Sequence, residues 1–215
     1  MELAALPAKV SEFYARDPEA ALLRRFSNCD EPFALASLGT LSASEVGAGA
    51  AIATRMVVFM TENQGVCHWG FDAEGGEDPP VYVAVDGAPW RLHNASFASF
   101  LECQVWDWSE HAFMATAQAS ALSEAEVSSL RALLVEGPTT HGWPGERQRR
   151  FSSDDGSVLL WESDDQTDWM LRADTRAGFE RLVAWMGQVR QSSDGWFYAV
   201  TEPAALALEA MAHRS

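Results

Sequence analysis

The stretch RMVVFMTENQGVCHWGFD, residues 55–72, contains the clearest fold signal in the chain. Residues 55–62 form an apolar run that is typical of a buried β-strand. The tripeptide NQG at 63–65 is turn chemistry, because glycine adopts positive φ without strain. Residues 66–71 form a second strand-like run. The stretch therefore predicts a β-hairpin whose turn lies at 63–65.

The same alternation of apolar runs and turns extends beyond this hairpin. The acidic loop DAEGGEDPP (72–80) precedes a strand-like run at 81–85. Asp86-Gly87 is another turn signal. Runs at 157–163 and 168–173 predict a second hairpin. These regions indicate antiparallel strands joined by short connections, a β-meander.

Helical periodicity occurs before, between and after these strands. Apolar spacing, capping residues and a proline suited to a first turn predict helices near 3–13, 97–108, 123–136, 179–187 and from 203 onward. This order indicates an α+β fold, with a central, mostly antiparallel sheet flanked by helices. We expect one domain over residues 1–190, with a C-terminal strand and helix at 191–215 packed on it.

Two of the expected helices carry specific signals. Ser123 and Glu126 have the spacing of a capping box, which marks a helix N-terminus. In the helix after Ser96, an apolar stripe is expected to face the core. It consists of Phe97, Leu101, Val105 and Trp108.

The chain carries a net charge of −16, from 31 acidic and 15 basic residues. Nucleic acids and anionic membranes bind cationic surfaces, so we expect neither as a partner. The charge favours a basic protein partner, whose association it would accelerate. The alternative is that the charge serves only solubility.

The cysteines suggest a reducing compartment. Cys29, Cys67 and Cys103 form an odd, sparse set that is typical of small core residues. The N-terminus lacks the basic and apolar regions of a secretion signal. No stretch reaches the roughly 18 apolar residues of a membrane span. We therefore expect a cytoplasmic protein.

The hairpin contains groups that are capable of chemistry, but their spacing is unfavourable. Cys67 and His68 are neighbours on a strand, so their side chains point to opposite faces and cannot easily form a dyad or share a metal. No zinc motif, nucleophile elbow or phosphate loop occurs. We expect no catalytic residue, metal or cofactor. The enzymatic alternative is a hydrolase that uses the loop carboxylates Asp72, Glu74, Glu77 and Asp78.

One segment runs against the overall acidity. HGWPGERQRR (141–150) concentrates His141, Arg147, Arg149 and Arg150 near Trp143. These cations could contact an acidic patch on a partner or neutralise acids of this protein. We favour the second interpretation.

The motifs around the first hairpin resemble those of the SUKH superfamily. ENQGV (62–66), WG (69–70) and DPPV (78–81) occur in that order, before Trp90 and the helix SFASFLECQVWDW (96–108). The opening LPAKVSEFYA (6–15) is also similar to the start of that family. The resemblance covers residues 55–110 most closely.

This resemblance implies a non-enzymatic α+β protein that acts by binding another protein. Many bacterial members of the family are similar to immunity proteins that neutralise a cognate toxin, and a basic toxin domain would suit the charge of this chain. The alternative is a general interaction or regulatory module without a toxin. The corresponding motif and candidate partner-binding positions are Glu62, Asn63, Gln64, Gly65, Trp69, Gly70, Asp72, Asp78, Pro79, Pro80 and Trp90.

Overall fold

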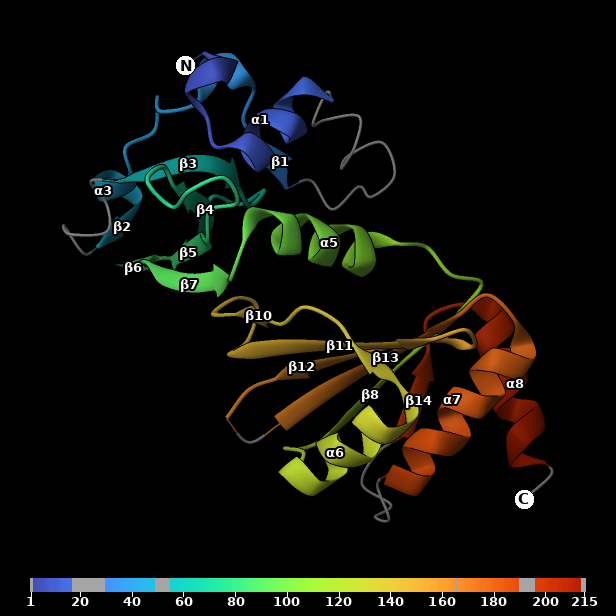
Figure 1. Ribbon diagram of the computed structural model, residues 1–215. Helices are drawn as coiled ribbons and strands as arrows, with labels where there is room; N and C mark the ends of the chain where they lie inside the picture. Colours follow the sequence, from blue (N-terminus) through green and yellow to red (C-terminus); the bar gives the residue numbers. More distant parts are fainter. Residues whose placement is uncertain (1, 17–29, 49–54, 165, 190–195, 214–215) are drawn as a thin grey trace. The chain divides into compact units, whose positions relative to one another are not determined.

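The computed structural model describes residues 2–16, 30–48, 55–164, 166–189 and 196–213 (Figure 1). The contacts divide the chain into two compact units. The first unit comprises Met1–Ser109 and Thr140–Trp143, and the second comprises Glu110–Thr139 and Pro144–Ser215. The short segment Thr140–Trp143 therefore belongs to the first unit, although the chain on either side of it belongs to the second.

The first unit is built on a five-stranded sheet with the order β1–β3–β4–β5–β7. All neighbouring strands in it are antiparallel, and β2 and β6 form a separate short parallel pair. The elements of this unit are η1 (Leu3–Ala5), α1 (Ala8–Ala15), β1 (Glu31–Pro32), η2 (Leu35–Ser37), α3 (Ala43–Val46), β2 (Gly47–Ala48), β3 (Met56–Thr61), β4 (Cys67–Asp72), β5 (Val81–Val85), β6 (Gly87–Pro89), β7 (Arg91–Asn94), α5 (Phe97–Trp108) and β10 (Thr140–His141).

Strand alternation gives this sheet two apolar faces. One face packs against α1 and α5, where Phe59 contacts the rings of Phe71, Phe97 and Phe100. The other face carries a smaller cluster around α3. Its buried members are Ala43, Met56, Val58, Ala84 and Trp90.

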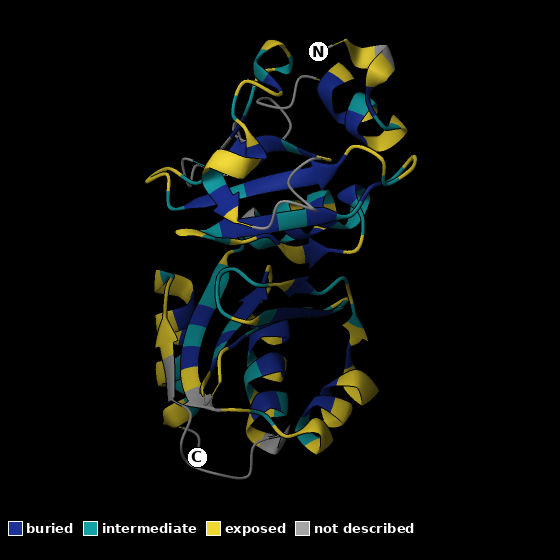
Figure 2. Ribbon diagram, turned by 90° about the vertical axis from the view of Figure 1, so that its left-hand side faces the viewer, coloured by how far each residue is buried: buried dark blue, intermediate teal, exposed yellow. Residues whose placement is uncertain are grey.

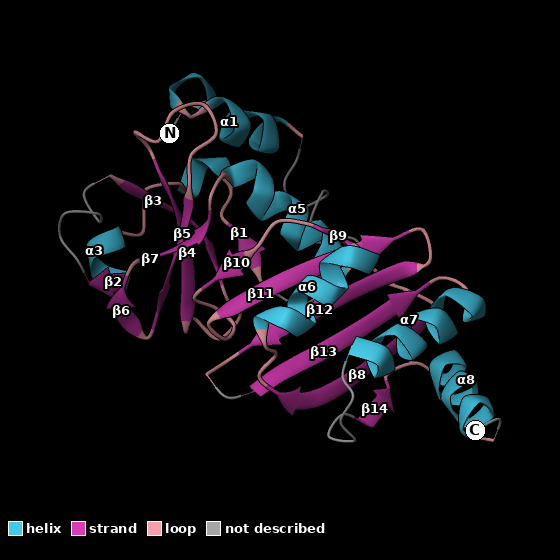
Figure 3. Cartoon of the chain, turned by 60° about the horizontal axis from the view of Figure 1, so that its bottom comes forward, coloured by secondary structure: helices cyan, strands magenta, loops and turns pink. Residues whose placement is uncertain are grey.

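The second unit contains an antiparallel sheet with the order β11–β12–β13–β8–β14, and β9 pairs with β11. Helices α6 and α7 lie across one face of this sheet (Figure 3). The elements are β8 (Phe113–Ser120), α6 (Glu124–Leu133), β9 (Val135–Glu136), β11 (Arg147–Ser153), β12 (Gly156–Glu162), β13 (Gln166–Ala173), α7 (Arg176–Val189), β14 (Trp196–Ala199) and α8 (Glu202–Ala212).

The predicted α+β class is confirmed, because helices accompany mostly antiparallel sheets. Both predicted hairpins are present as β3–β4 and β12–β13. The expected single domain over 1–190 differs from the two observed units. The physical reason is that the two sheets bury separate sets of apolar side chains, so each unit has its own core. The expected C-terminal strand and helix are β14 and α8, and both belong to the second unit.

The α5 stripe was predicted only in part. Phe97 is buried as expected, but Val105 is 45% exposed. The buried residues that follow Phe97 are Phe100 and Cys103, three and six positions further along. Leu101 is partly buried and packs against the same core, so the stripe is confirmed at Phe97 and Leu101. It is wrong at Val105, near which Cys103 is the buried residue instead.

Candidate functional site

The turn of the first hairpin is held by Glu62. Its carboxylate accepts hydrogen bonds from the backbone N–H of Gln64 (2.9 Å) and of Val66 (3.4 Å). Gly65 has a φ of 73°, and its N–H donates to the carbonyl oxygen of Glu62 at 2.8 Å. The predicted turn is confirmed. The side chains of Asn63 and Gln64 are exposed, so these are the motif residues a partner can reach at this turn.

Cys67 and His68 lie on opposite faces of β4, as predicted. Cys67 is completely buried in the core next to α1 and α5. Burial, with the nearby carboxylates of Asp30, Glu62 and Asp86, raises the pKa of its thiol far above the usual value. His68 instead lies 3.1 Å from the hydroxyl of Thr61 through Nδ1, and burial lowers its pKa. The geometry therefore gives the thiol no contact with the imidazole.

Trp69 begins a buried chain of hydrogen bonds. Its indole N–H donates to Nε2 of His93 at 3.1 Å. Because indole nitrogen is only a donor, Nε2 must be unprotonated and His93 carries its proton on Nδ1. That Nδ1–H donates to the carbonyl oxygen of His141 at 2.7 Å. The chain fastens the segment Thr140–Trp143 to the sheet of the first unit.

Gly70 and Trp90 are packing partners on the opposite face of that sheet. A Cβ atom at position 70 would lie 2.6 Å from Cγ of Met56 and 3.3 Å from the indole of Trp90. Trp90 is buried, and its indole N–H donates to the carbonyl oxygen of Ala43 at 3.0 Å. The glycine at position 70 therefore leaves room for both side chains.

The acidic loop before β5 is held by its own carboxylates. Asp72 accepts from Arg55 at 2.7 Å and from the backbone N–H of Glu74 at 2.9 Å. Asp78 accepts from the backbone N–H of Ala98 at 2.9 Å, so it adds a second side-chain acceptor to the N-cap Ser96 at the start of α5. The carbonyl oxygen of Pro80 accepts from the N–H of Asp72 at 3.3 Å. Asp72 and Asp78 thus have different partners.

Pro79 and Pro80 pack against Gly75 in the same loop. A Cβ atom at Gly75 would lie within 3.0 Å of the ring atoms of both prolines. The two prolines therefore shape the entry into β5, which agrees with their predicted place at the start of a strand.

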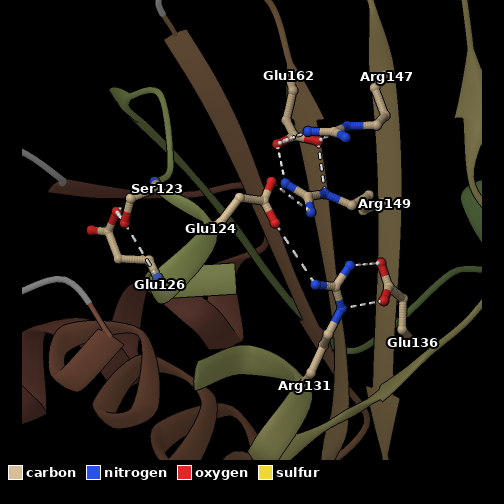
Figure 4. Close-up of polar contacts among 8 residues, drawn as sticks. All are labelled: Ser123, Glu124, Glu126, Arg131, Glu136, Arg147, Arg149 and Glu162. Atoms are coloured by element: carbon tan, nitrogen blue, oxygen red, sulfur yellow. Dashed lines mark hydrogen bonds and ion pairs between the residues drawn. The ribbon is translucent and has the colours of Figure 1, made fainter. Parts of the chain in front are cut away.

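In the second unit, arginines and glutamates form a network across α6, β9, β11 and β12 (Figure 4). Glu162 accepts from Nε of Arg147 at 2.8 Å and from Nε of Arg149 at 2.9 Å. Glu136 accepts from Nε of Arg131 at 2.6 Å. Glu124 on α6 lies 3.9 Å from Arg131 and 4.0 Å from Arg149. Figure 4 also shows the Ser123–Glu126 capping box, which confirms that prediction.

The network shows which groups the arginines of the basic segment 141–150 bind. The side chain of Arg149 is only 3% exposed. Burial alone would raise the pKa of Glu162, but the hydrogen bonds from Arg149 and Arg147 outweigh it and lower the pKa. Arg150 is buried and donates to Gln148 and to the carbonyl oxygen of Pro138. The prediction that these arginines neutralise the protein's own acids is confirmed for Arg147 and Arg149.

Other kinds of site were sought over the described part of the chain. There, no group of three or more His, Cys, Asp or Glu side chains is placed to hold a metal ion. None of the helices within these ranges has the length and apolarity needed to cross a membrane. Cys67 and Cys103 are free and buried, and Cys29 lies outside the described residues. Comparison of the chain with family models, curated proteins and solved structures found no match.

Sequence reasoning missed two residues that organise these sites. His93 lies in the unremarkable sequence RLHN, and its partner His141 is 48 positions away. Arg55 directly precedes β3, and its partner Asp72 is 17 positions away. No local sequence pattern marks a histidine that is buried between two polar groups. The Arg55–Asp72 pair, in contrast, can be predicted once the strand register of the hairpin is known.

Proposed function

We propose that this chain is a non-enzymatic, acidic protein-binding domain that neutralises a cationic protein, in the manner of an immunity protein and its toxin. The observation that carries the proposal is the burial and ion pairing of the arginines in the second unit. Each arginine among the described residues of that unit is buried or held in an ion pair. Several exposed acidic residues in the described part of the same unit form no ion pair with a described residue. They are Glu110, Glu146, Asp154, Asp164, Glu202 and Glu209.

This imbalance supports a cationic partner. Arg131, Arg147, Arg176 and Arg181 reach the surface, but each is paired with an acid of this chain. The exposed charge without an ion-pair partner among the described residues of the unit is therefore acidic. A surface of one sign can raise the association rate of an oppositely charged partner by roughly 10- to 1,000-fold. It also disfavours nucleic acid, whose phosphates would be repelled. The net charge of −16 has the same sign.

The motif residues support the proposal as parts of the scaffold. Trp69, Gly70 and Trp90 are buried in packing, while Glu62 and Asp78 bind backbone amides. Holding the loops in this way leaves partner recognition to other side chains. This division of labour resembles that expected of a family whose members share a framework and bind different proteins.

The test is co-expression of this chain with the protein encoded beside its gene. The proposal expects restored growth and a stable complex on a sizing column. Continued killing together with the absence of a complex would contradict it. A charge-reversal variant, Glu146→Arg with Asp154→Arg and Asp164→Arg, should weaken the complex while the fold is retained.

The enzymatic alternative has its own test. Asp72→Asn and Cys67→Ala with His68→Ala remove the groups on which a hydrolase or a Cys-His mechanism would depend. A binding protein should protect cells in each case, provided that circular dichroism shows the fold to be intact. Loss of protection with an intact fold and an intact complex would favour enzymatic action.

A further inference from the structure

The second sheet ends in a strand with an open side. Its strand order stops at β14, which pairs with β8 and with no other strand of the described residues. Tyr198, Ala199 and Val200 are all exposed, Tyr198 to 50% and Val200 to 58% (Figure 2). The backbone of an unpaired sheet edge can accept a further strand.

The hydrogen bonds to β8 determine which backbone groups of β14 face the open side. The N–H of Val200 donates to the carbonyl oxygen of Met114 at 2.8 Å, and the register places these two residues opposite each other. In an antiparallel pair, such hydrogen-bonded residues alternate with residues whose N–H and C=O groups point away from the neighbouring strand. Phe197 and Ala199 are therefore the residues of β14 whose backbone groups point outward.

The edge lacks the features that usually prevent strand pairing. Natural proteins protect sheet edges with charged side chains, prolines or bulges. Residues 196–200, WFYAV, contain neither a charge nor a proline, and β14 pairs with β8 without a register shift. Two copies of a chain with a net charge of −16 repel each other at long range, but these strands would bring no like charges into contact. The edge therefore suits a neutral, apolar strand, which a second copy of the chain supplies.

The side chain of Tyr198 extends this surface. Ala115 and Ala117 on β8 belong to the core beneath the helices, so Thr116 between them points to the opposite face of the sheet. Tyr198 pairs with Thr116 and shares that face. Val200 lies two residues further along the chain on the same side. Pairing of the edge with a second strand would cover part of both exposed side chains.

We propose that this chain forms a symmetric dimer in which β14 of one copy pairs antiparallel with β14 of a second copy. Phe197 of each copy exchanges backbone hydrogen bonds with Ala199 of the other, and the two sheets become continuous. This register places Tyr198 opposite Tyr198 of the second copy, in a non-hydrogen-bonded pair with about 4.5 Å between the Cα atoms. The same surface of each copy forms both halves of the interface, as two-fold symmetry requires. The inference goes beyond the proposed function, because it concerns the pairing of the chain with itself.

Sedimentation velocity of the full chain over a range of concentrations is the direct test. We expect a dimer that dissociates on dilution, because a strand this short supplies few hydrogen bonds. Ala199→Pro removes the outward N–H and leaves the hydrogen bonds to β8. It should weaken dimerisation by about tenfold or more, since the N–H is lost from both copies. Ala199→Ser keeps the N–H and should dimerise like the wild type. A monomeric wild type, or equal dimerisation of Ala199→Pro, would overturn the proposal.

Disulfide cross-linking tests the register without a proline. In a Cys29→Ser background, Tyr198→Cys places the thiols of the two copies opposite each other, at a Cα separation that a disulfide can span. Val135→Cys is the matched control, because Val135 is an exposed apolar residue on another short strand, β9. Oxidised glutathione should convert the first variant into a covalent dimer and leave the second monomeric. Equal cross-linking of the two variants would overturn the proposal.

The salt dependence separates this dimer from the proposed function. Salt screens the repulsion between two chains of net charge −16, so dimerisation should strengthen as salt rises. Binding of a cationic protein should weaken under the same change. A chain that dimerises but binds no cationic protein would contradict the proposed function and leave the dimer intact. A monomeric chain whose amide signals at 196–200 shift on addition of a partner protein would assign the edge to that partner and overturn the dimer.

Discussion

The two units use their acidic side chains in different ways. In the first unit, Glu62 and Asp78 accept hydrogen bonds from backbone amides and so fix a turn and a helix end. In the second unit, Glu162 binds two arginines, and the side chain of Arg149 is almost inaccessible to water. Loss of an acid at an exposed turn leaves an amide that water can reach. Loss of Glu162 leaves a buried guanidinium without its charge partner.

Acidic residues of the same type therefore contribute unequally to the stability of the fold. The motif acids hold local backbone, the network acid compensates a buried cation, and Glu202 and Glu209 on α8 pair with no described residue. Substitutions should therefore separate into three classes by their effect on stability.

Glu162→Ala should have the largest effect. It leaves Arg149 buried without its carboxylate, and breaking a buried pair in this way costs about 3 kcal/mol or more. Urea denaturation, with hydrogen exchange of the β11 and β12 amides as a local probe, measures the loss. Glu146→Ala, on an exposed acid, serves as control and should change stability little. Equal losses in the two variants would end the distinction between network and surface acids.

The pH dependence of stability tests whether the charge of Glu162 is what stabilises the fold. The folded-state pKa of Glu162 lies below its usual value, so its contribution to stability is present above the unfolded pKa and disappears as pH falls through the folded pKa. The stability difference between the wild type and Glu162→Gln should therefore shrink below about pH 4. Unfolding measured from pH 7 to pH 3 checks this. A difference that stays constant would show that the charge of Glu162 is not responsible.

Gly70→Ala and Gly65→Ala form a pair that separates packing from backbone strain. At Gly70 a methyl group would collide with Met56, and overpacking of this kind costs about 2 kcal/mol. A Cβ atom added at Gly65 would have no neighbouring atom within 4 Å, but φ is +73° there. Alanine at this position should therefore cost about 1 kcal/mol. Thermal unfolding of both variants measures the order. A larger loss for Gly65→Ala would contradict the packing role assigned to Gly70.

Asp78→Ala removes the acceptor for the N–H of Ala98 in the first turn of α5, while the N-cap Ser96 remains, and should cost about 1 kcal/mol. Asp78→Asn retains an oxygen that can accept from Ala98, so it should cost clearly less. Chemical denaturation of the two variants tests the role. If both substitutions were equally harmful, the negative charge rather than the cap would be the important feature.

Glu62→Gln should have the smallest effect in this set. The amide oxygen still accepts from the N–H groups of Gln64 and Val66, and only the gain from an ionised acceptor is lost, about 0.5 kcal/mol. Glu62→Ala, which removes the acceptor, should cost more. Hydrogen-exchange rates of the two turn amides would show directly whether the bonds persist.

The parts of the fold that the sequence predicted are those with local signals. Apolar runs on either side of the NQG turn predicted β3 and β4, and the Ser123–Glu126 pattern predicted the start of α6. β11 was not predicted, because Arg147 and Arg149 occupy it only by pairing with Glu162 on a neighbouring strand. β8 was also missed: its buried residues Ala115 and Ala117 are too small to form a strong apolar pattern.

In the candidate sites, too, features with a local sequence signal could be predicted and features that depend on distant contacts could not. The turn glycine follows from local chemistry, and the structure agrees with it. Trp69, a candidate partner-binding position from its motif, is instead buried in the core. The Trp69–His93–His141 chain depends on contacts between distant segments and on membership of Thr140–Trp143 in the first unit.

Recognition through the acidic surface is tested most directly by the salt dependence of binding to the protein encoded beside this chain's gene, which we expect to be cationic. Isothermal titration at 50 mM and 300 mM salt would measure the affinity. We expect a complex at low salt that weakens by about tenfold or more at high salt, because the long-range attraction between the two proteins is screened. No complex at low salt, or an affinity that does not change with salt, would contradict recognition through this protein's acidic surface.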